Sequence, residues 1–202
     1  METILQHVPA IISALGVILT AWFSYNQYTK NKQTDRKIEN WKREEEQKSV
    51  IRSDNYAIIY GELWDLLHSF EADRVYIIQP HPLDESRYLS IALEVDRKGI
   101  SKMKPDIQKL PMSEVAVFAR ALAKDDFAYY RSMLEIGDKK TRSILSSKGT
   151  FAAFIKHMTD GKRWVGNIVC EFTRPCQVDR ITAENALCEK ADTIGYILPE
   201  IN

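Results

Sequence analysis

The histidines and cysteines of this 202-residue chain have the widest chemistry, since they serve as metal ligands, nucleophiles and proton carriers. No histidine lies at metal-ligand spacing from another ligand. The cysteines are odd in number and lack a CxxC pair, which argues against a zinc site and a disulfide framework. The sequence therefore predicts no metal. The residues considered are His7, His68, His81 and His157, and Cys170, Cys176 and Cys188.

Two of these residues invite a closer reading. Cys170 shares a predicted strand face with Trp164 and Phe172 and has no adjacent base, so we interpret it as a small core side chain. His81 lies between two prolines in a predicted loop, where it either reaches a pocket mouth or sits in solvent.

The clustered carboxylates do not form an acid/base pair. Asp125 and Asp126, like Glu44 to Glu46, are neighbours in sequence, and neighbouring side chains on a helix point apart. There is also no glycine-rich loop that would hold a phosphate. We therefore expect no catalytic residue, no cofactor and no enzymatic activity.

Aromatic residues give the strongest hint of a ligand. Tyr60, Trp64, Tyr88 and Trp164 could line a small-molecule pocket between a sheet and its helices, and core packing is the alternative explanation. The 28 basic residues balance the 28 acidic ones, so no global field attracts nucleic acid. Any electrostatic function must be local.

The first element expected along the chain is a helix, because the run Val8 to Tyr25 has no charged residue. From Ile4 to Tyr25 a helix would extend about 33 Å, enough to cross a hydrocarbon core of about 30 Å. We expect residues 1–28 to form a single-pass anchor with the lipid bilayer as partner. Trp22, Phe23 and Tyr25 would mark the membrane interface.

The flanking charges predict the orientation of this anchor. The residues before the run include Glu2 and no lysine or arginine, which argues against a cleaved signal peptide. The first basic residues, beginning with Lys30, follow the run, which favours a cytoplasmic C-terminal domain at the inner (plasma) membrane. Gly16, Thr20 and Ser24 form a stripe of small side chains that predicts a homo-oligomer.

Residues 29–52 have no glycine or proline and carry mixed charges, typical of a helical stalk. Residues 53–202 then predict one α+β domain: a mainly antiparallel sheet with helices on one face. The expected elements are a helix after Ser53, strands Val75–Ile78 and Tyr88–Val95, a helix Ser113–Ala123 that the run Phe127–Leu134 extends or reorients, a small helix after Asp138, a hairpin Phe151–Met158 and Arg163–Thr173, and a helix from Asp179 to Leu198.

The strand Tyr88–Val95 has a clear alternation. Leu89, Ile91, Leu93 and Val95 are predicted to share one face of the sheet, with polar residues on the other. The stretch "TDGK" after Met158 predicts a tight hairpin turn, because Asp-Gly supplies the positive φ that such turns need.

The pattern "GTFAAFIKHMTDGKRWVGNIVCEF" followed by a helix resembles the end of GAF/PAS-type domains, and the likeness extends over about Ser53 to Leu198. This resemblance implies a GAF/PAS-like fold. The signature of cyclic-nucleotide-binding members, Asn-Lys…Phe…Asp-Glu, does not occur, and no cysteine lies in a bilin-attachment context.

The layout also resembles the holin of T-even bacteriophages. The stretches "EADRVYIIQPHP", "RYLSIALEV" and "WVGNIVCEFTRPCQVDRITAENALCEKADTIGYI" follow the order of that family's soluble domain. This resemblance implies oligomers that open the inner membrane and trigger host lysis, with a periplasmic domain, whereas the basic flank at Lys30 favours a cytoplasmic one.

Two functions therefore stay open. The first is a membrane-anchored, non-enzymatic GAF/PAS-like module for sensing, scaffolding or partner binding, whose partner is a protein or a small molecule. The alternative is a phage holin of the T-even type.

Overall fold

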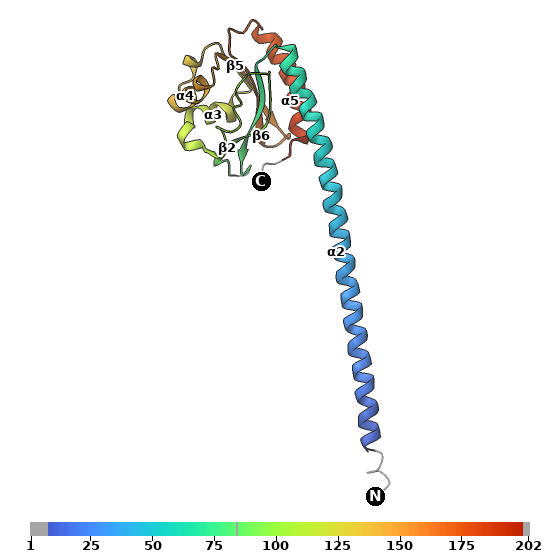
Figure 1. Cartoon of the computed structure of the whole chain (residues 1–202). Helices are drawn as coiled ribbons and strands as arrows, with labels where there is room; N and C mark the ends of the chain where they lie inside the picture. Colours follow the sequence, from blue (N-terminus) through green and yellow to red (C-terminus); the bar gives the residue numbers. More distant parts are fainter. Residues whose placement is uncertain (1–7, 84, 200–202) are drawn as a thin grey trace. The chain divides into compact units, whose positions relative to one another are not determined.

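The computed structural model describes residues 8–83 and 85–199, leaving aside the side chains of residues 8–21, 31 and 33–36. The chain divides into two compact units, Met1–Ile51 and Arg52–Asn202. Helix α2 (Val8–Ser69) contributes residues to both (Figure 1).

The first unit is the N-terminal part of α2. Its described side chains from Trp22 to Ile51 are exposed, except for a half-buried Thr29. Arg43 pairs with Glu39 at 2.8 Å, one helical turn apart. No glycine or proline occurs between residues 17 and 60, so nothing interrupts the helix. The expectation of a new helix beginning after Ser53 is therefore wrong.

The second unit is an α+β domain around one six-stranded antiparallel sheet. The strand order is β3-β2-β1-β6-β5-β4. The strands are β1 (Arg74–His81), β2 (Tyr88–Asp96), β3 (Leu110–Pro111), β4 (Phe127–Tyr130), β5 (Ala152–Thr159) and β6 (Trp164–Phe172). The predicted α+β class with a mainly antiparallel sheet is confirmed.

Helices cover both faces of this sheet, so the expectation of helices on one face is wrong. One face packs against the last part of α2 and against α5 (Arg180–Ile197), as Figure 1 shows. The other packs against α3 (Ala116–Lys124), α4 (Lys139–Ser147), and the short 3-10 turns η1 (Met112–Val115) and η2 (Met133–Glu135). We call them the α2/α5 face and the α3/α4 face.

A bulge in the pairing of β1 with β2 directs the side chains of the two halves of β2 into different cores. Because the register shifts between Ile77 and Ile78, Leu93 and Val95 join the α2/α5 core, whereas Leu89 and Ile91 join the α3/α4 core. The predicted single face for these four residues is therefore wrong, since one inserted residue reverses the direction of every later side chain.

Two further differences concern β4 and β1. The run after Phe127 is not helical but forms β4 at the sheet edge, where Phe127 to Tyr130 pair with β5. β1 continues past the predicted stop at Pro80, which pairs with β2 only. The ladder with β6 ends at Ile78, so the missing N–H of Pro80 removes no hydrogen bond to β6.

The C-terminal part follows the sequence pattern closely. Gly161, at φ 86°, makes the predicted turn between β5 and β6, and the Asp160 carboxylate accepts hydrogen bonds from two backbone N–H groups there. Asp179 caps α5 by accepting from the Thr182 N–H at 3.0 Å. Near the end of α5, a Cβ on Gly195 would lie 2.4 Å from the Thr159 carbonyl oxygen, so only glycine allows this approach.

Candidate functional site

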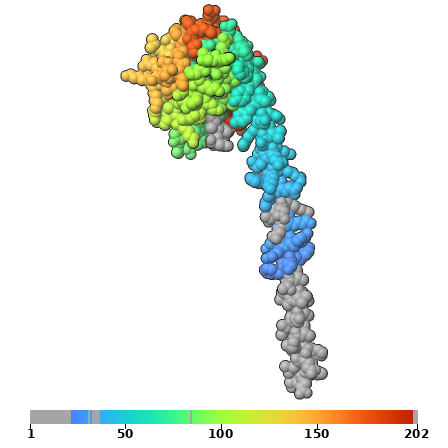
Figure 2. All heavy atoms as spheres, in the orientation of Figure 1, coloured from blue at the N-terminus to red at the C-terminus, as the bar shows by residue number. Residues whose placement is uncertain are grey.

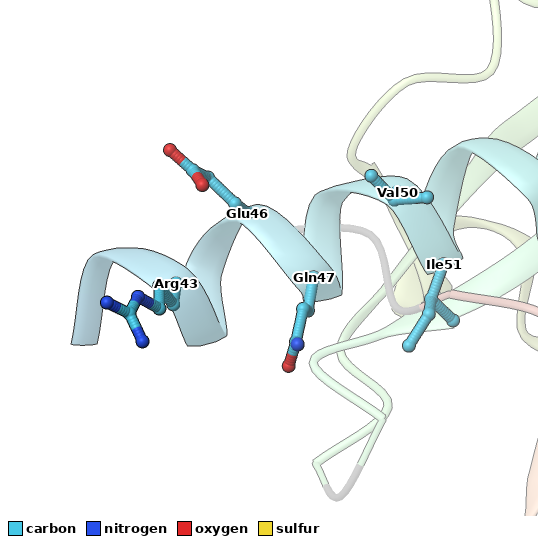
Figure 3. A pocket seen from close by; sticks show the side chains of 5 residues that line it. All are labelled: Arg43, Glu46, Gln47, Val50 and Ile51. Atoms are coloured by element: carbon cyan, nitrogen blue, oxygen red, sulfur yellow. The ribbon is translucent and has the colours of Figure 1, made fainter. Parts of the chain in front are cut away.

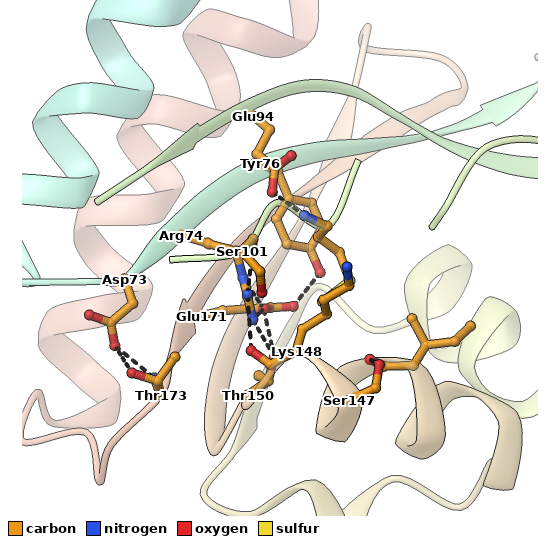
Figure 4. Close-up of polar contacts among 12 residues, drawn as sticks. Asp73, Arg74, Tyr76, Glu94, Ser101, Ser147, Lys148, Thr150, Glu171 and Thr173 are labelled. Carbon is orange, nitrogen blue, oxygen red and sulfur yellow. Dashed lines mark hydrogen bonds and ion pairs between the residues drawn. The ribbon is translucent and has the colours of Figure 1, made fainter. Parts of the chain in front are cut away.

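A buried ion pair joins the central strands β1 and β6. Arg74 and Glu171 lie opposite each other in the ladder and are fully buried. Arg74 donates from Nε and Nη2 to Oε2 of Glu171 at 2.9 and 2.6 Å (Figure 4). The Tyr76 hydroxyl donates to the second carboxylate oxygen, Oε1, at 2.5 Å. Both oxygens are therefore bonded, which offsets the cost of removing the charges from water.

The same guanidinium connects three chain segments. Its Nη1 donates to the backbone carbonyls of Ser101 at 2.8 Å and Lys148 at 3.2 Å. Its Nη2 donates to the Thr150 hydroxyl at 2.6 Å, and that hydroxyl donates to Glu171 at 2.8 Å. The loop after β2 and the link from α4 to β5 are thus held against β1 and β6. We call Arg74, Tyr76, Thr150 and Glu171 the Arg74 cluster.

The electrostatics of the Arg74 cluster suit positioning rather than proton transfer. Burial, followed by the neighbouring Glu171 carboxylate, raises the pKa of the Tyr76 hydroxyl well above its ordinary value, so Tyr76 stays protonated as a donor. All three nitrogens of the Arg74 guanidinium and both oxygens of Glu171 are engaged. The cluster has no open group for a substrate.

The loop 97–109 has a second attachment. Glu94 on β2 accepts hydrogen bonds from the backbone N–H groups of Met103 at 2.6 Å and Lys104 at 2.9 Å. Lys148 pairs with Asp106 at 2.6 Å. These bonds hold the fully buried Met103 in the α3/α4 core. The loop is therefore a fixed part of the cover over this face.

A second polar group lies at the far end of β1. His81 Nε2 and Ser90 Oγ are 2.8 Å apart, and Ser90 Oγ also accepts from the Lys109 N–H at 2.8 Å. Ser90 Oγ thus bridges His81 and the backbone at Lys109. Burial, with the Lys109 charge, lowers the pKa of His81. Ser90 is only 1% exposed, so this Ser–His pair is not open to a substrate.

This arrangement corrects the expectation of a loop His81. The structure places His81 within β1 at 8% exposure, with its ring tilted against that of Tyr88 and the ring centroids 5.6 Å apart. Gln79, opposite Ser90 in the ladder, is fully buried, and its side-chain amide has no partner among the described residues. Sequence reasoning missed Gln79, Ser90 and the Arg74 cluster, because each depends on pairing between distant strands.

The four aromatic residues expected to line one pocket are not brought together. Tyr60 and Trp64 lie on the exposed side of α2, and Trp64 stacks on His68. Tyr88 is on β2 beside His81. Trp164 packs with the α3/α4 core, where its Nε1 donates to Asn167 at 2.9 Å and its ring stacks on His157.

The thiols occupy three separate environments. Cys170 is fully buried in the α2/α5 core, and burial strongly raises its pKa, which agrees with the predicted core role. Cys176 is half-buried after β6, where burial also raises its pKa, and Cys188 is exposed on α5. Among the described residues, no three histidine, cysteine, aspartate or glutamate side chains could hold a metal ion together.

The residues of the predicted anchor are described only in part. Trp22, Phe23, Tyr25 and Ser24 are exposed on α2. The stripe of Gly16 and Thr20 falls within residues 8–21, whose side chains lie outside what the structure describes. No helix among those described has both the length and the apolar character that a membrane crossing requires.

Three hollows lie at the surface. One lies on the side of α2 alone, between Arg43, Glu46, Gln47, Val50 and Ile51 (Figure 3). Another, of about 400 Å³, lies between η2 and α4. A third, of about 290 Å³, is polar and lies where α2 ends, between Glu71 and Arg174. None of these is lined by the middle of the sheet.

No protein-family model matches this sequence, and no curated protein does. Solved structures of GAF domains do match the fold. GAF3 from Slr1393 of Synechocystis sp. PCC6803, in its photoproduct state, has a TM-score of 0.58 at 12% identity, covering 70% of this chain and 90% of that one. The blue-light absorbing form of the Thermosynechococcus elongatus PixJ GAF domain has 0.59 at 14%, covering 72% and 85%.

A phycocyanobilin-bound GAF domain from a cyanobacterial phytochrome gives a TM-score of 0.54 at 14% identity, covering 73% of this chain and 91% of that one. At such identities the similarity concerns the fold alone. The second unit of this chain therefore has a GAF-like α+β fold, in agreement with the resemblance drawn from its C-terminal pattern.

Proposed function

We propose that this protein is a membrane-tethered, non-enzymatic module whose GAF-like domain binds a protein partner. The observation that carries the proposal is the closed packing of the domain. Large side chains fill both faces of the sheet, and the Arg74 cluster is completely buried beneath the α3/α4 layer. Small ligands bind in concave, mostly enclosed cavities, whereas partner proteins bind exposed surfaces.

One of the GAF domains named above has a bound bilin. We therefore considered whether this chain could hold a bilin chromophore. Covalent attachment of a bilin needs an accessible thiol next to a large cavity. Cys170 is buried in the α2/α5 core, and Cys188 lies on the exposed side of α5. Cys176 is half-buried and lines the polar hollow where α2 ends, whose volume of about 290 Å³ is below the usual range of ligand pockets. The three hollows named above lie at the surface and not between the sheet and its helices. These residues do not fit a bilin, and we propose no chromophore.

The tether is inferred from the sequence. The uncharged run Val8 to Tyr25 has the length of a membrane-spanning helix, and the basic residues that follow it favour a cytoplasmic domain. Attachment to a membrane would raise the local concentration of the domain near membrane-bound partners. This is the advantage that a scaffolding module would gain from the anchor.

The holin alternative rests on sequence layout, and no curated protein sequence supports it. It differs from the proposed function in two measurable ways: it requires a periplasmic domain, and it requires loss of membrane potential on expression. One experiment therefore separates the two functions.

The full chain should be expressed in bacteria with C-terminal reporters, one active only in the cytoplasm and one active only outside it. A chain without residues 1–28 is the matched control. We expect the full chain in the membrane fraction, an active cytoplasmic reporter and viable cells, with the control in the soluble fraction. A soluble full chain would contradict the tether, and a periplasmic reporter signal with abrupt loss of membrane potential would favour the holin.

A second measurement addresses ligand binding. The purified full chain is incubated with phycocyanobilin and with biliverdin, then denatured and examined by absorption. We expect no retained chromophore. A covalent adduct, lost in a variant of one cysteine, would overturn the proposal of a protein-binding module.

A further inference from the structure

The charges of the domain are separated between its two helical layers, although the whole chain is neutral. The segment 97–149, which forms the α3/α4 layer and β4, has twelve lysines and arginines against six aspartates and glutamates. On the other side, residues 53–69 of α2 and α5 together have six acidic and two basic residues. One layer is therefore net positive, and the layer across the sheet is net negative.

The basic layer has a defined hollow with an apolar rim. It lies between η2 and α4 and measures about 400 Å³. Leu134 at its edge is 80% exposed. Lys139 and Arg142 line it and make no ion pair with any described residue, whereas the neighbouring Lys140 pairs with Glu114. The hollow thus offers two uncompensated cations beside an apolar contact.

The acidic layer has the matching chemistry. On the outer side of α2, Tyr60 and Trp64 are 38% and 43% exposed, next to Asp65, whose side chain is 70% exposed. Lys190 lies 3.6 Å from Asp65, but its closer contact is with Glu62. Large aromatic side chains beside an acidic group are typical of binding surfaces.

We propose that the domain associates head to tail with a second copy of this chain. The outer side of α2, with Tyr60, Trp64 and Asp65, docks on the hollow between η2 and α4 of the next copy. Asp65 then faces Lys139 and Arg142, and the aromatic rings cover Leu134. This proposal rests on the proposed function and names its partner.

Charge complementarity decides both the partner and the mode of contact. If two basic layers or two acidic layers met symmetrically, like charges would oppose each other, which is unfavourable at a desolvated interface. A basic layer against an acidic layer pairs opposite charges. Figure 2 shows α4 and the last part of α2 at opposite sides of the domain. The contact is therefore heterologous and leaves a free face on each copy, so it extends into chains.

Two charge reversals test the contact. Full-length protein is labelled separately with donor and acceptor dyes and reconstituted in neutral phosphatidylcholine vesicles, and association is measured by energy transfer between copies. Arg142→Glu alone and Asp65→Arg alone should each weaken association at least about tenfold, because each places like charges together. Added NaCl at about 0.5 M should weaken the wild-type association, because salt screens charges at this distance.

Mixing the two variants gives the decisive result. In a one-to-one mixture, the intact acidic face of Arg142→Glu meets the intact basic face of Asp65→Arg, so energy transfer should return. Lys162→Glu, the same charge change in the exposed β5–β6 turn, is the control and should associate like wild type. Far-UV circular dichroism of each variant checks the fold.

Other outcomes overturn the proposal. Single variants that associate like wild type, or a mixture without recovery, would rule out the head-to-tail contact. Association only with an added nucleic acid would assign the basic layer to another partner. If the chain does not enter vesicles, the same measurement is made in solution, so failure of the tether is distinguishable from failure of the contact.

Discussion

The two faces of the central sheet are covered in different ways. On the α2/α5 face, the apolar sides of two helices pack against the sheet, and the core contains aromatic rings and aliphatic side chains. On the α3/α4 face, short helices, 3-10 turns and the loop 97–109 make the cover, and the Arg74 cluster is buried among them. Both cores are closed, and the buried ion pair of Arg74 with Glu171 belongs to the α3/α4 face.

The difference follows from element length. A helix of eighteen residues, such as α5, satisfies its own backbone and needs only an apolar face to dock. A loop has free carbonyl groups that must find donors when they are buried. The Arg74 guanidinium supplies such donors to Ser101 and Lys148. A buried cation thus allows irregular chain to cover a sheet.

The largest expected effect is a cavity in the α2/α5 core. The Phe154 ring contacts the rings of Phe70, Phe127, Tyr129 and Phe172. Phe154→Ala should lower the free energy of unfolding by about 3–5 kcal/mol, measured by urea denaturation. Phe151→Ala, at a 43% exposed neighbour, should change it by about 0.5 kcal/mol or less. A similar loss in both variants would contradict the assigned core.

The Arg74 cluster should respond in a different manner. Glu171→Leu leaves the Arg74 charge buried without its counter-ion and should cost about 3–5 kcal/mol. The double variant Arg74→Met, Glu171→Leu should recover part of this loss, because no buried charge remains. Loop carbonyls still lose their donor, so hydrogen exchange in residues 97–109 should be faster than in wild type. Unchanged exchange would show that the cation does not hold the loop.

A smaller effect is expected for one hydroxyl of that cluster. Tyr76→Phe removes the donor to Glu171 Oε1 and should cost about 1–3 kcal/mol in urea denaturation, since a buried carboxylate oxygen loses its partner. Tyr130→Phe is the matched control, because the Tyr130 hydroxyl makes no hydrogen bond to a described residue, and we expect little change. Equal losses would count against the special role of Tyr76.

The smallest expected effect is a pH dependence at His81. Because its pKa is lowered in the folded protein, the unfolded chain binds a proton first as pH falls through the ordinary value of 6.5. Stability should be complete above that value and decline as the pH falls below it, toward the lowered pKa of the folded protein. His81→Asn should reduce this decline in urea denaturation at each pH. The pKa values of Asp160 and Asp179 are also lowered, but their effect on stability is lost only as the pH falls below about 3.8 and does not overlap with that of His81.

The sequence predicted much of the fold, but not the polar sites. Alternation and turn residues identified the antiparallel sheet, and Asp160-Gly161 identified the hairpin. The β1–β2 bulge was missed because a single inserted residue leaves the alternation of polar and apolar residues unbroken in the sequence. The strand β4 was mistaken for helix because four residues at a sheet edge take their conformation from pairing.

By itself, the sequence determined the α+β class, the hairpin turn at Asp160-Gly161 and the cap at Asp179, because these depend on residues close together in the chain. The tertiary structure alone decided that helices cover both faces, that Arg74 meets Glu171 from 97 residues away, and that the charges of a neutral chain separate into two layers. The physical reason is that burial and charge pairing depend on distances in space, which strand register sets and sequence spacing does not.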